Sequence, residues 1–296
     1  MSKLDELIQQ HCPDGVEYKQ IGEVFETVTD YVAAGSFADL RKNVKYINSP
    51  DYAMLVRTMD IKNGYTSSNP VYIDENAFNY LWRVHLDKEC IVMPNIGNCG
   101  EVYHLLPKNN PYNRCALAPN AILLRTESAS TRYLYHVLQT PLFQKQLSKI
   151  VSPTGQTKFN KTELKKLEVP IPALPVQREI VRILDEFSLL SAELAAELAA
   201  ELAARKQQYE FYRDQLLSFD TNITEKNLSD VLRIRNGKDY KRFGQGKYPV
   251  YGTGGIIAYI DSFAYNKPSV LIPRKGSLDK LYYVEDVFGN SKVISF

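Results

Sequence analysis

The stretch SAELAAELAAEL, at Ser191–Leu202, is the most informative part of this 296-residue chain. Leu194, Leu198 and Leu202 recur every four residues, and at 3.6 residues per turn each step rotates the leucine position by only about 40°. The three leucines therefore share one broad face of a helix. Alanine and glutamate are strong helix formers, and nothing in the stretch breaks a helix.

The predicted helix extends well beyond this repeat. Pro170 and Pro172 impose extended chain before it, and Pro175 suits its first turn. Neither proline nor glycine occurs from Val176 to about Phe219, so the helix would be about 65 Å long. It carries an apolar stripe that needs a partner, such as a second helix. The stripe consists of Ile180, Leu184, Phe187, Leu194, Leu198, Leu202, Tyr209 and Leu216.

The helix lies between two blocks of mixed structure. In the first block, turn signals separate short β-like runs, and a helix is expected at Ser130–Ile150. The β-like runs include Tyr52–Ile61, Glu89–Gly97 and Asn120–Thr126. We expect an α+β fold in three parts. These are a mixed α/β domain at 1–170, a long coiled-coil-type spacer helix at 171–220 and a partial second domain at 221–296.

The second block resembles the first. Lys267–Val284 aligns with Lys88–Leu105: in both, a β run meets a proline, a glycine follows three residues later, and a second strand comes next. Lys226–Gly237 is likewise similar to Tyr18–Asp30. Such internal repetition indicates a duplicated domain. No counterpart of Ser130–Asn160 follows in the second block, so we expect that copy to be incomplete.

Composition narrows the class of protein. The chain is 44% hydrophobic and has no apolar run of about 18 residues, so we expect neither a membrane helix nor a secretory signal. Its four cysteines form no CxxC pair, which favours a reduced cytoplasmic protein over a disulfide scaffold or a zinc site. Residues 171–220 carry 5 basic and 9 acidic side chains, and residues 221–296 carry 12 and 7. This distribution favours nucleic acid at the blocks and not along the helix.

No motif indicates catalysis. Gly252–Gly255 is glycine-rich, but a phosphate-binding loop also needs Gly-Lys-Ser/Thr at the start of a helix. Asn109–Tyr112 (NNPY) is similar to the catalytic tetrapeptide of adenine-N6 methyltransferases but lacks its second proline, and no glycine-rich cofactor loop precedes it. The four histidines are scattered. We therefore expect no catalytic residue, no metal site and no cofactor in this chain.

The polar loop at Ser152–Asn160 has better chemistry for nucleic acid. Gly155 allows close approach of a phosphate, Lys158 can neutralise one, and Gln156 can pair with adenine in the major groove. A solvated surface loop is the alternative that the residues leave open. The candidate DNA-contacting residues are Gly155, Gln156, Thr157, Lys158, Asn160, Arg41, Lys42, Lys45, Asn95, Asn98, Arg274 and Lys275.

Several of these segments resemble the specificity (S) subunit of type I restriction–modification systems. The resemblance rests on the proline run with VQREIVRILDEF (Val176–Phe187), the AEL repeat, and RKQQYEFYRDQLLSF (Arg205–Phe219). SPTGQTKFNKTELKKLEVPIP is similar to the end of a target-recognition domain of that family. YPVYGTGGIIAYID with VLIPRKGS is similar to the start of another.

The resemblance implies a non-catalytic reader of double-stranded DNA. In the family, two antiparallel helices hold two recognition domains apart, each domain reads one half of a split target, two methyltransferase (M) subunits dock, and a restriction (R) subunit can join. We expect a subunit that binds one half-site and scaffolds adenine methyltransferase subunits, with S-adenosylmethionine on the M subunits only. Two alternatives remain: a half-length subunit that homodimerises through its helix to read a symmetric site, and a coiled-coil adaptor that binds only proteins.

Overall fold

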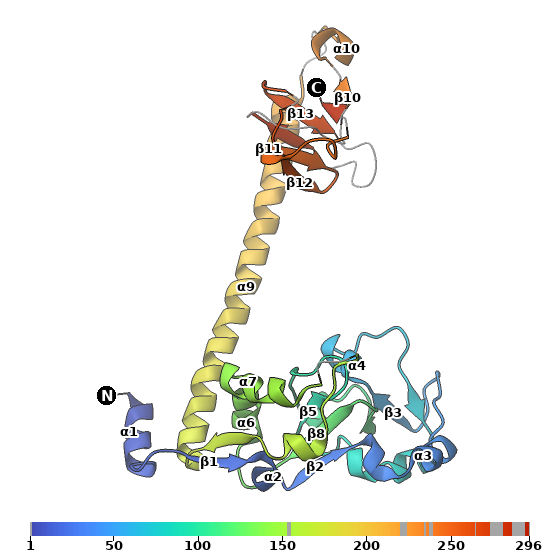
Figure 1. The fold of residues 1–296 in the computed structure, drawn as a ribbon, viewed down its shortest axis with the longest axis vertical. Helices are drawn as coiled ribbons and strands as arrows, with labels where there is room; N and C mark the ends of the chain where they lie inside the picture. Colours follow the sequence, from blue (N-terminus) through green and yellow to red (C-terminus); the bar gives the residue numbers. More distant parts are fainter. Residues whose placement is uncertain are drawn as a thin grey trace. The chain divides into compact units, whose positions relative to one another are not determined.

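The computed structural model describes residues 2–152, 155–219, 224–233, 235–236, 239–263, 265–272, 281–285 and 294–295. The chain divides into two compact units, residues 1–202 and 203–296, which are described separately below (Figure 1). The mixture of strands and helices confirms the predicted α+β class. The candidate residues Arg274 and Lys275 lie outside the described residues.

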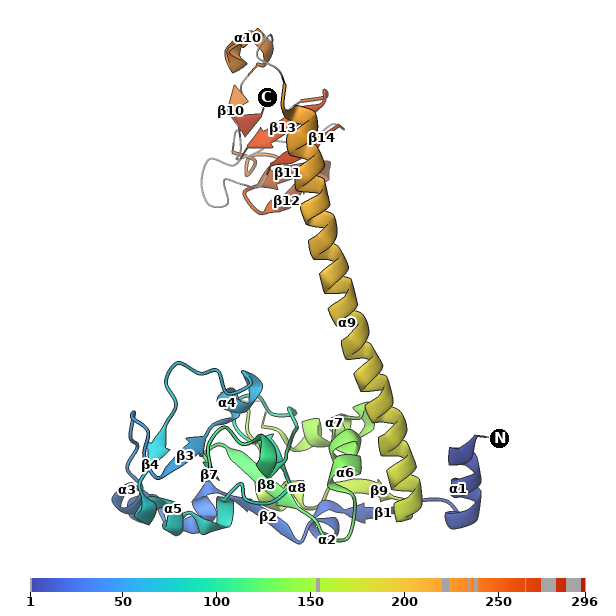
Figure 2. The same ribbon diagram turned by 180° about the vertical axis from the view of Figure 1, so that it is seen from behind.

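The long helix α9 covers Leu174–Leu217, 44 residues, and confirms the prediction made from the repeat (Figure 2). Its first turns are anchored in unit 1. Gln177 is buried, its Nε2 donates to the carbonyl of Pro172 at 2.8 Å, and its Oε1 accepts from the Ser130 backbone N–H at 2.9 Å. Glu179 pairs with Lys3 of the N-terminal helix α1 (Lys3–His11) at 3.1 Å.

Unit 1 is built on two main sheets and one strand pair. The antiparallel sheet has the order β2 (Thr27–Asp30), β8 (Ala121–Arg125), β5 (Cys90–Pro94), β6 (Tyr103–Leu105). The smaller sheet has the order β4 (Tyr72–Ile73), β3 (Ala53–Val56), β7 (Cys115–Leu117), with β3 and β7 parallel. The remaining pair is β1 (Glu17–Gln20) with β9 (Glu168–Ile171).

Strand β5 is buried on both faces and separates two hydrophobic cores. Because side chains alternate along a strand, Cys90 and Val92 face one core while Ile91 and Met93 face the other. The first core is completed by η1 (Tyr31–Ala34), α3 (Phe37–Asn43), α4 (Thr58–Lys62), α5 (Glu75–Tyr80) and η2 (Trp82–Val84). The second is covered by α2 (Ile21–Val24), α6 (Thr131–Leu138), α7 (Pro141–Ile150) and α8 (Lys161–Leu164). A short turn of helix, η3 (Pro107–Asn109), follows β6.

The helix predicted at Ser130–Ile150 is two helices, so that prediction was wrong in one respect. The first ends at Leu138, and Thr140 caps the second, its Oγ1 accepting from the Phe143 N–H at 3.3 Å. Pro141 occupies the first turn of α7, where its missing N–H costs nothing. The chain therefore turns at Thr140, and both α6 and α7 lie against the same core.

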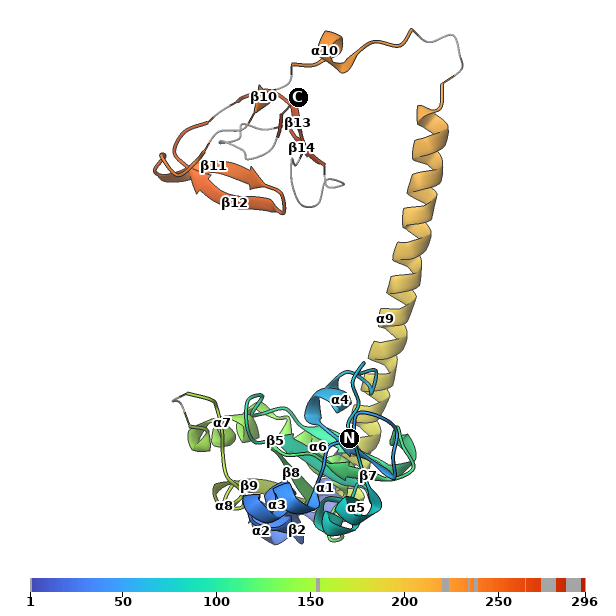
Figure 3. The same cartoon turned by 90° about the vertical axis from the view of Figure 1, so that its right-hand side faces the viewer.

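Unit 2 contains a four-stranded sheet with the strand order of the sheet in unit 1; Figure 3 labels its strands β10, β13 and β14. Its four strands have the order β10 (Arg235–Asn236), β15 (Ile294–Ser295), β13 (Ser269–Ile272), β14 (Tyr282–Val284), which matches β2, β8, β5, β6. Ser269 pairs with Val284 as Cys90 pairs with Leu105, so the register of the described strands agrees with the alignment predicted from sequence. The other described elements are α10 (Leu228–Val231) and the hairpin β11 (Gln245–Gly252) with β12 (Gly255–Ile260).

A buried ion pair fixes the start of α4. Asp60 is fully buried and accepts from Nε and Nη2 of Arg57 at 2.8 and 2.7 Å and from the Arg57 backbone N–H at 2.9 Å. Burial opposes the charge on Asp60, but these hydrogen bonds outweigh it and hold the pKa of Asp60 below its ordinary value. The Arg57 Nη2 also donates to the carbonyl of Asn69 at 2.9 Å, which ties down the following loop.

We predict that Asp60→Asn lowers the free energy of unfolding by about 2 kcal/mol at pH 7, because the Arg57 guanidinium loses its counter-charge. The contribution of a carboxyl whose folded pKa is depressed is present at neutral pH and is lost as the pH falls through that folded pKa. Urea unfolding of both proteins over a pH series measures this. A difference that stays constant down to acid pH would contradict the ionic origin.

Candidate nucleic-acid interface

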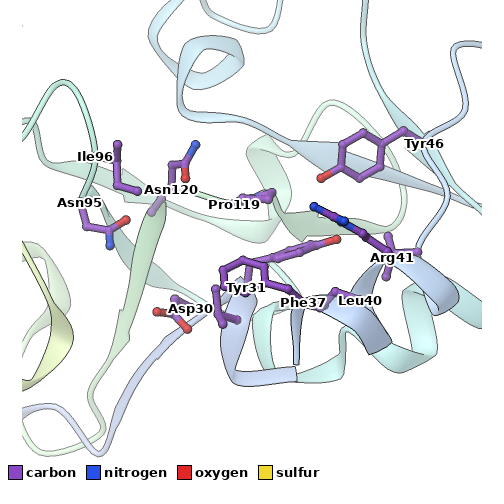
Figure 4. Close-up of a pocket in the computed structure, with 13 residues that line it drawn as sticks. Asp30, Tyr31, Phe37, Leu40, Arg41, Tyr46, Asn95, Ile96, Pro119 and Asn120 are labelled. Carbon is purple, nitrogen blue, oxygen red and sulfur yellow. The ribbon is translucent and has the colours of Figure 1, made fainter. Parts of the chain in front are cut away.

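A cavity of about 440 Å³ opens in unit 1 at the carboxyl ends of β2 and β5 (Figure 4). Arg41 and Tyr46 lie at one end of it, and Asn95, Ile96 and Asn120 at the other. Tyr31, Phe37, Leu40 and Pro119 give it a largely apolar wall. Flat apolar walls with a few polar groups at the ends suit a planar, partly polar ligand group.

Asn95 directly follows β5 and holds the polar end of this cavity. Its backbone N–H donates to the carbonyl of Asn120 at 3.1 Å, and its carbonyl accepts from the Phe159 N–H at 3.0 Å. The side-chain Nδ2 donates to the carbonyl of Phe159 at 3.3 Å, which fixes the orientation of the amide. Its Oδ1 is buried and has no hydrogen-bond partner among the described residues. A buried acceptor without a donor is costly and marks a position that a ligand or water can satisfy.

The polar loop lies directly beside Asn95. Ile96 and Lys158 form a β-bridge, and the Gly97 N–H donates to the carbonyl of Thr157 at 2.8 Å. Gly155 has a φ of +70°, a conformation that glycine adopts without strain. The side chains at the outside of the loop are all exposed: Gln156, Thr157 and Lys158. This short β pairing places the exposed loop beside Ile96, which lines the cavity.

Helix α3 brings the basic cluster to the opposite rim. Ser36 caps its start by accepting from the Asp39 N–H at 3.2 Å. Arg41 and Lys42 lie in its last turn, where cations are favoured by the helix dipole. Both are exposed, as is Lys45, and Arg41 also lines the cavity. Arg41 of α3 thus lies at one end of the cavity, and Ile96, which forms a β-bridge with Lys158, lies at the other.

An ion pair neutralises the carboxylate in the cavity wall. Lys161 Nζ lies 2.7 Å from Asp30 Oδ1, which also accepts from the Ala33 N–H at 3.0 Å. Burial, together with the charge interaction and hydrogen bond with Tyr46, raises the pKa of Tyr31, so its phenol stays protonated. The site therefore presents donors and positive charge, which is what a phosphate or a base edge requires.

Two predicted residues have local partners that bear on their proposed role. Asn160 caps α8, with its Oδ1 accepting from the Glu163 N–H at 2.8 Å, so that oxygen is engaged in the fold. Asn98 is exposed in the turn after β5, and its side chain forms a hydrogen bond with the Glu101 carboxylate. Whether either residue contacts DNA stays a prediction.

Sequence reasoning missed the aromatic wall of Tyr31, Phe37 and Tyr46, although Tyr46 follows the basic cluster directly.

The two segments that are similar to catalytic motifs, Asn109–Tyr112 and Gly252–Gly255, have structural roles in the fold. Asn110 Nδ2 donates to the carbonyl of Leu86 at 2.7 Å, and the Tyr112 hydroxyl donates to the carbonyl of Asp51 at 2.6 Å. Thr253 and Gly254 form the turn between β11 and β12.

Within the described ranges, no group of three or more His, Cys, Asp or Glu side chains could hold a metal ion. None of the described helices is long and apolar enough to cross a membrane.

The apolar stripe of α9 divides into a packed and an uncovered part. Ile180 packs against the second core of unit 1, whereas Leu184 is 36% exposed. The remaining members of the stripe are each more than half exposed: Phe187, Leu194, Leu198, Leu202, Tyr209 and Leu216. Exposed apolar stripes of this kind are typical of helices that bind a partner.

Comparison with known proteins places the chain in a family. A family model described as the type I restriction modification DNA specificity domain matches residues 13–204. The EcoprrI type I restriction enzyme specificity subunit of Escherichia coli is 42% identical over 119 residues, 37% of this chain and 30% of that protein. The putative specificity subunit S.HindORF215P of Haemophilus influenzae is 34% identical over 165 residues, 51% of this chain and 42% of that protein. The chain thus spans less than half the length of these relatives.

Solved structures share the fold. The HsdS subunit of Thermoanaerobacter tengcongensis matches with a TM-score of 0.52 and 11% identity, covering 96% of this chain and 75% of that one. A structure describing complex assembly and conformational transition of the type I R-M system matches with a TM-score of 0.54 and 14% identity, over the same shares of the two chains. Because the family model covers well over half of the sequence, the chain belongs to the family of type I restriction modification DNA specificity domains.

Proposed function

We propose that this chain is the DNA-recognition component of a type I restriction–modification complex and that unit 1 reads double-stranded DNA. The proposed recognition surface consists of the polar loop 155–160, Asn95 and Asn98, and the basic cluster Arg41, Lys42 and Lys45. The observation that supports it most directly is that Arg41 and Asn95 line the same cavity and that Ile96, another lining residue, forms a β-bridge with Lys158 of the loop. Family membership supports the same conclusion.

The chemistry of this surface suits a duplex. Exposed lysines and Arg41 can neutralise phosphates, while amide side chains such as Gln156 can pair with base edges in the major groove. The competing carboxylate of Asp30 is paired with Lys161 at 2.7 Å. A protein adaptor that binds no DNA would have no need of this arrangement, and steep weakening of DNA binding with salt distinguishes the two hypotheses.

We propose that α9 is the assembly element. Its uncovered stripe would bind either adenine methyltransferase M subunits or the α9 of a second copy, and the second arrangement would read a symmetric site. S-adenosylmethionine would then be bound by the M subunits, and a restriction subunit would be a further partner. The exposure of the stripe from Phe187 to Leu216 supports a role in association.

The first test concerns the polar loop. Lys158→Ala should weaken binding to all duplexes and lower the slope of log affinity against log salt by about one, because one phosphate contact is lost. Gln156→Ala should cost about 1–3 kcal/mol at one base position and leave the salt slope unchanged. Fluorescence anisotropy over a salt series, with duplexes selected from a random library, measures both effects.

Lys108→Ala is the matched control for the loop variants. Lys108 lies in η3, which follows β6 at the end of the sheet opposite to Asn95, so its loss should leave the affinity unchanged. Equal affinities for both loop variants and the unaltered protein, with the fold intact, would refute the assignment of the loop.

The second test concerns the stripe. Leu194→Lys with Leu198→Lys should abolish association, because two ammonium groups would replace apolar contacts at the centre of the stripe. Ala196→Lys with Ala200→Lys adds the same charge to the opposite face of the helix and should leave association intact. Sedimentation velocity at micromolar concentration measures the association state of the unaltered chain and of both variants. A monomeric unaltered chain that also fails to bind M subunits would contradict an assembly role.

The third test concerns catalysis. The purified chain with S-adenosylmethionine should transfer no methyl group to adenine and should cut no DNA, since neither a cofactor loop nor a methyltransferase tetrapeptide is recognisable in its sequence. Radiolabelled methyl transfer to duplex DNA checks this. Methylation by the chain alone would contradict the proposal that the M subunits carry out methyl transfer.

A further inference from the structure

Three aromatic side chains line the cavity of unit 1, and they differ in exposure. Tyr31 of η1 is 6% exposed and belongs to the first core, and its phenol forms a hydrogen bond with Tyr46. Phe37, the first residue of α3, is 71% exposed and Tyr46 is 55% exposed, although both line the cavity. The cavity therefore combines one buried aromatic side chain with two exposed ones. Exposed aromatic side chains beside cations are typical of surfaces on which nucleobases stack.

The opposite end of the cavity carries an exposed amide. Asn120 has a φ of +72°, a left-handed conformation that asparagine adopts more readily than most other residues. The Asn95 N–H donates to the Asn120 carbonyl at 3.1 Å and supports this conformation. Figure 4 shows the Asn120 side chain at the cavity, across from Arg41. An amide offers a donor and an acceptor side by side, which matches the amino group and a ring nitrogen at the edge of adenine or cytosine.

A base inside a duplex cannot use these groups together. Its two faces are covered by the neighbouring bases, so Tyr31 can contact a face only after the base has left the stack. The cavity volume of about 440 Å³ lies within the range of sites that enclose small ligands, about 300–1,000 Å³. Arg41 lines the same cavity, where its guanidinium can neutralise the phosphate of an extruded nucleotide.

We propose that the cavity binds one base that has been extruded from the DNA held by unit 1. This base carries an amino group, as adenine and cytosine do. Its faces contact Tyr31 and Phe37, and its edge pairs with the amide of Asn120. The proposal rests on the proposed function, because the base comes from DNA bound to the same surface. Contacts that only an extruded base can make offset the cost of unpairing and unstacking it.

The test uses duplexes that the unaltered chain selects from a random library. At each position of the selected site, fluorescence anisotropy compares a fully paired duplex, a duplex mismatched by changing the opposite base, and a duplex that is abasic at that position. A mismatch lowers the cost of extrusion and keeps the base. The abasic duplex deforms as readily as the mismatched one but has no base to place in the cavity.

We expect a preference at one adenine or cytosine of the site. There the mismatched duplex should bind about tenfold more tightly than the paired duplex, because unpairing no longer has to be supplied by the protein. It should also bind about tenfold more tightly than the abasic duplex, which makes no stacking contact with the cavity wall. A mismatched thymine at the same position should bind less tightly, since it has no amino group for Asn120.

Two variants change the cavity itself. Phe37→Ala removes an exposed aromatic face, and Val32→Trp places an indole where the base would lie; Val32 lines the cavity and is 43% exposed. Each should make the affinities for the mismatched and the abasic duplex equal. Trp82→Ala removes an aromatic side chain that is 62% exposed and lies outside the cavity lining, so it should keep the tenfold ratio. Circular dichroism checks the fold of each variant.

The ratio compares two duplexes on one protein, so a general loss of DNA affinity cancels. A preference for the mismatched over the abasic duplex that both cavity variants abolish supports the proposal. Equal binding of these two duplexes at every position, or a preference that survives both variants, overturns the base site and leaves DNA recognition by unit 1 standing. A chain that binds no duplex at low salt refutes the proposed function and the base site together.

Discussion

Two-sided burial of the central strand β5 is the constraint on which the rest of unit 1 depends. A strand with apolar side chains on both faces is stable only if both faces are covered, and here β3 and β7 with α3 and α5 cover one while α6, α7 and α8 cover the other. Packing of these two layers fixes the position and direction of β5. The residues that directly follow β5 are therefore held in place by the packing on both of its faces.

The fixed position of β5 determines where the proposed recognition surface lies. Asn95 leaves β5 between two partners, Asn120 after β7 and Phe159 in the polar loop, and hydrogen-bonds to both. The exposed loop is thereby attached to a strand that is buried on both faces. A rigid strand that carries adaptable loop side chains is an effective way to present groups to a ligand. The same principle explains why Arg41 approaches from a short helix packed on the first core.

Some of this could be predicted from sequence and some could not. The absence of proline and glycine between Val176 and Phe219 is a local signal, and it predicted α9 correctly. The alignment of Lys88–Leu105 with Lys267–Val284 predicted a shared register because equal spacing imposes equal pairing. The break at Thr140 was missed, since the apolar periodicity continues across it. The cavity could not be predicted, because Tyr31, Asn95 and Asn120 are far apart in sequence and meet only through sheet packing.

The most direct measurement of the central claim is hydrogen–deuterium exchange of the full chain with and without double-stranded DNA at low salt. DNA held on the proposed surface should slow exchange at residues 95–98, in the loop 155–160 and in the segment 41–46 together, and added salt should reverse the effect. Protection confined to other segments, such as η3 at Pro107–Asn109 or the strands of unit 2, with these three segments unchanged, would contradict a recognition surface at this cavity.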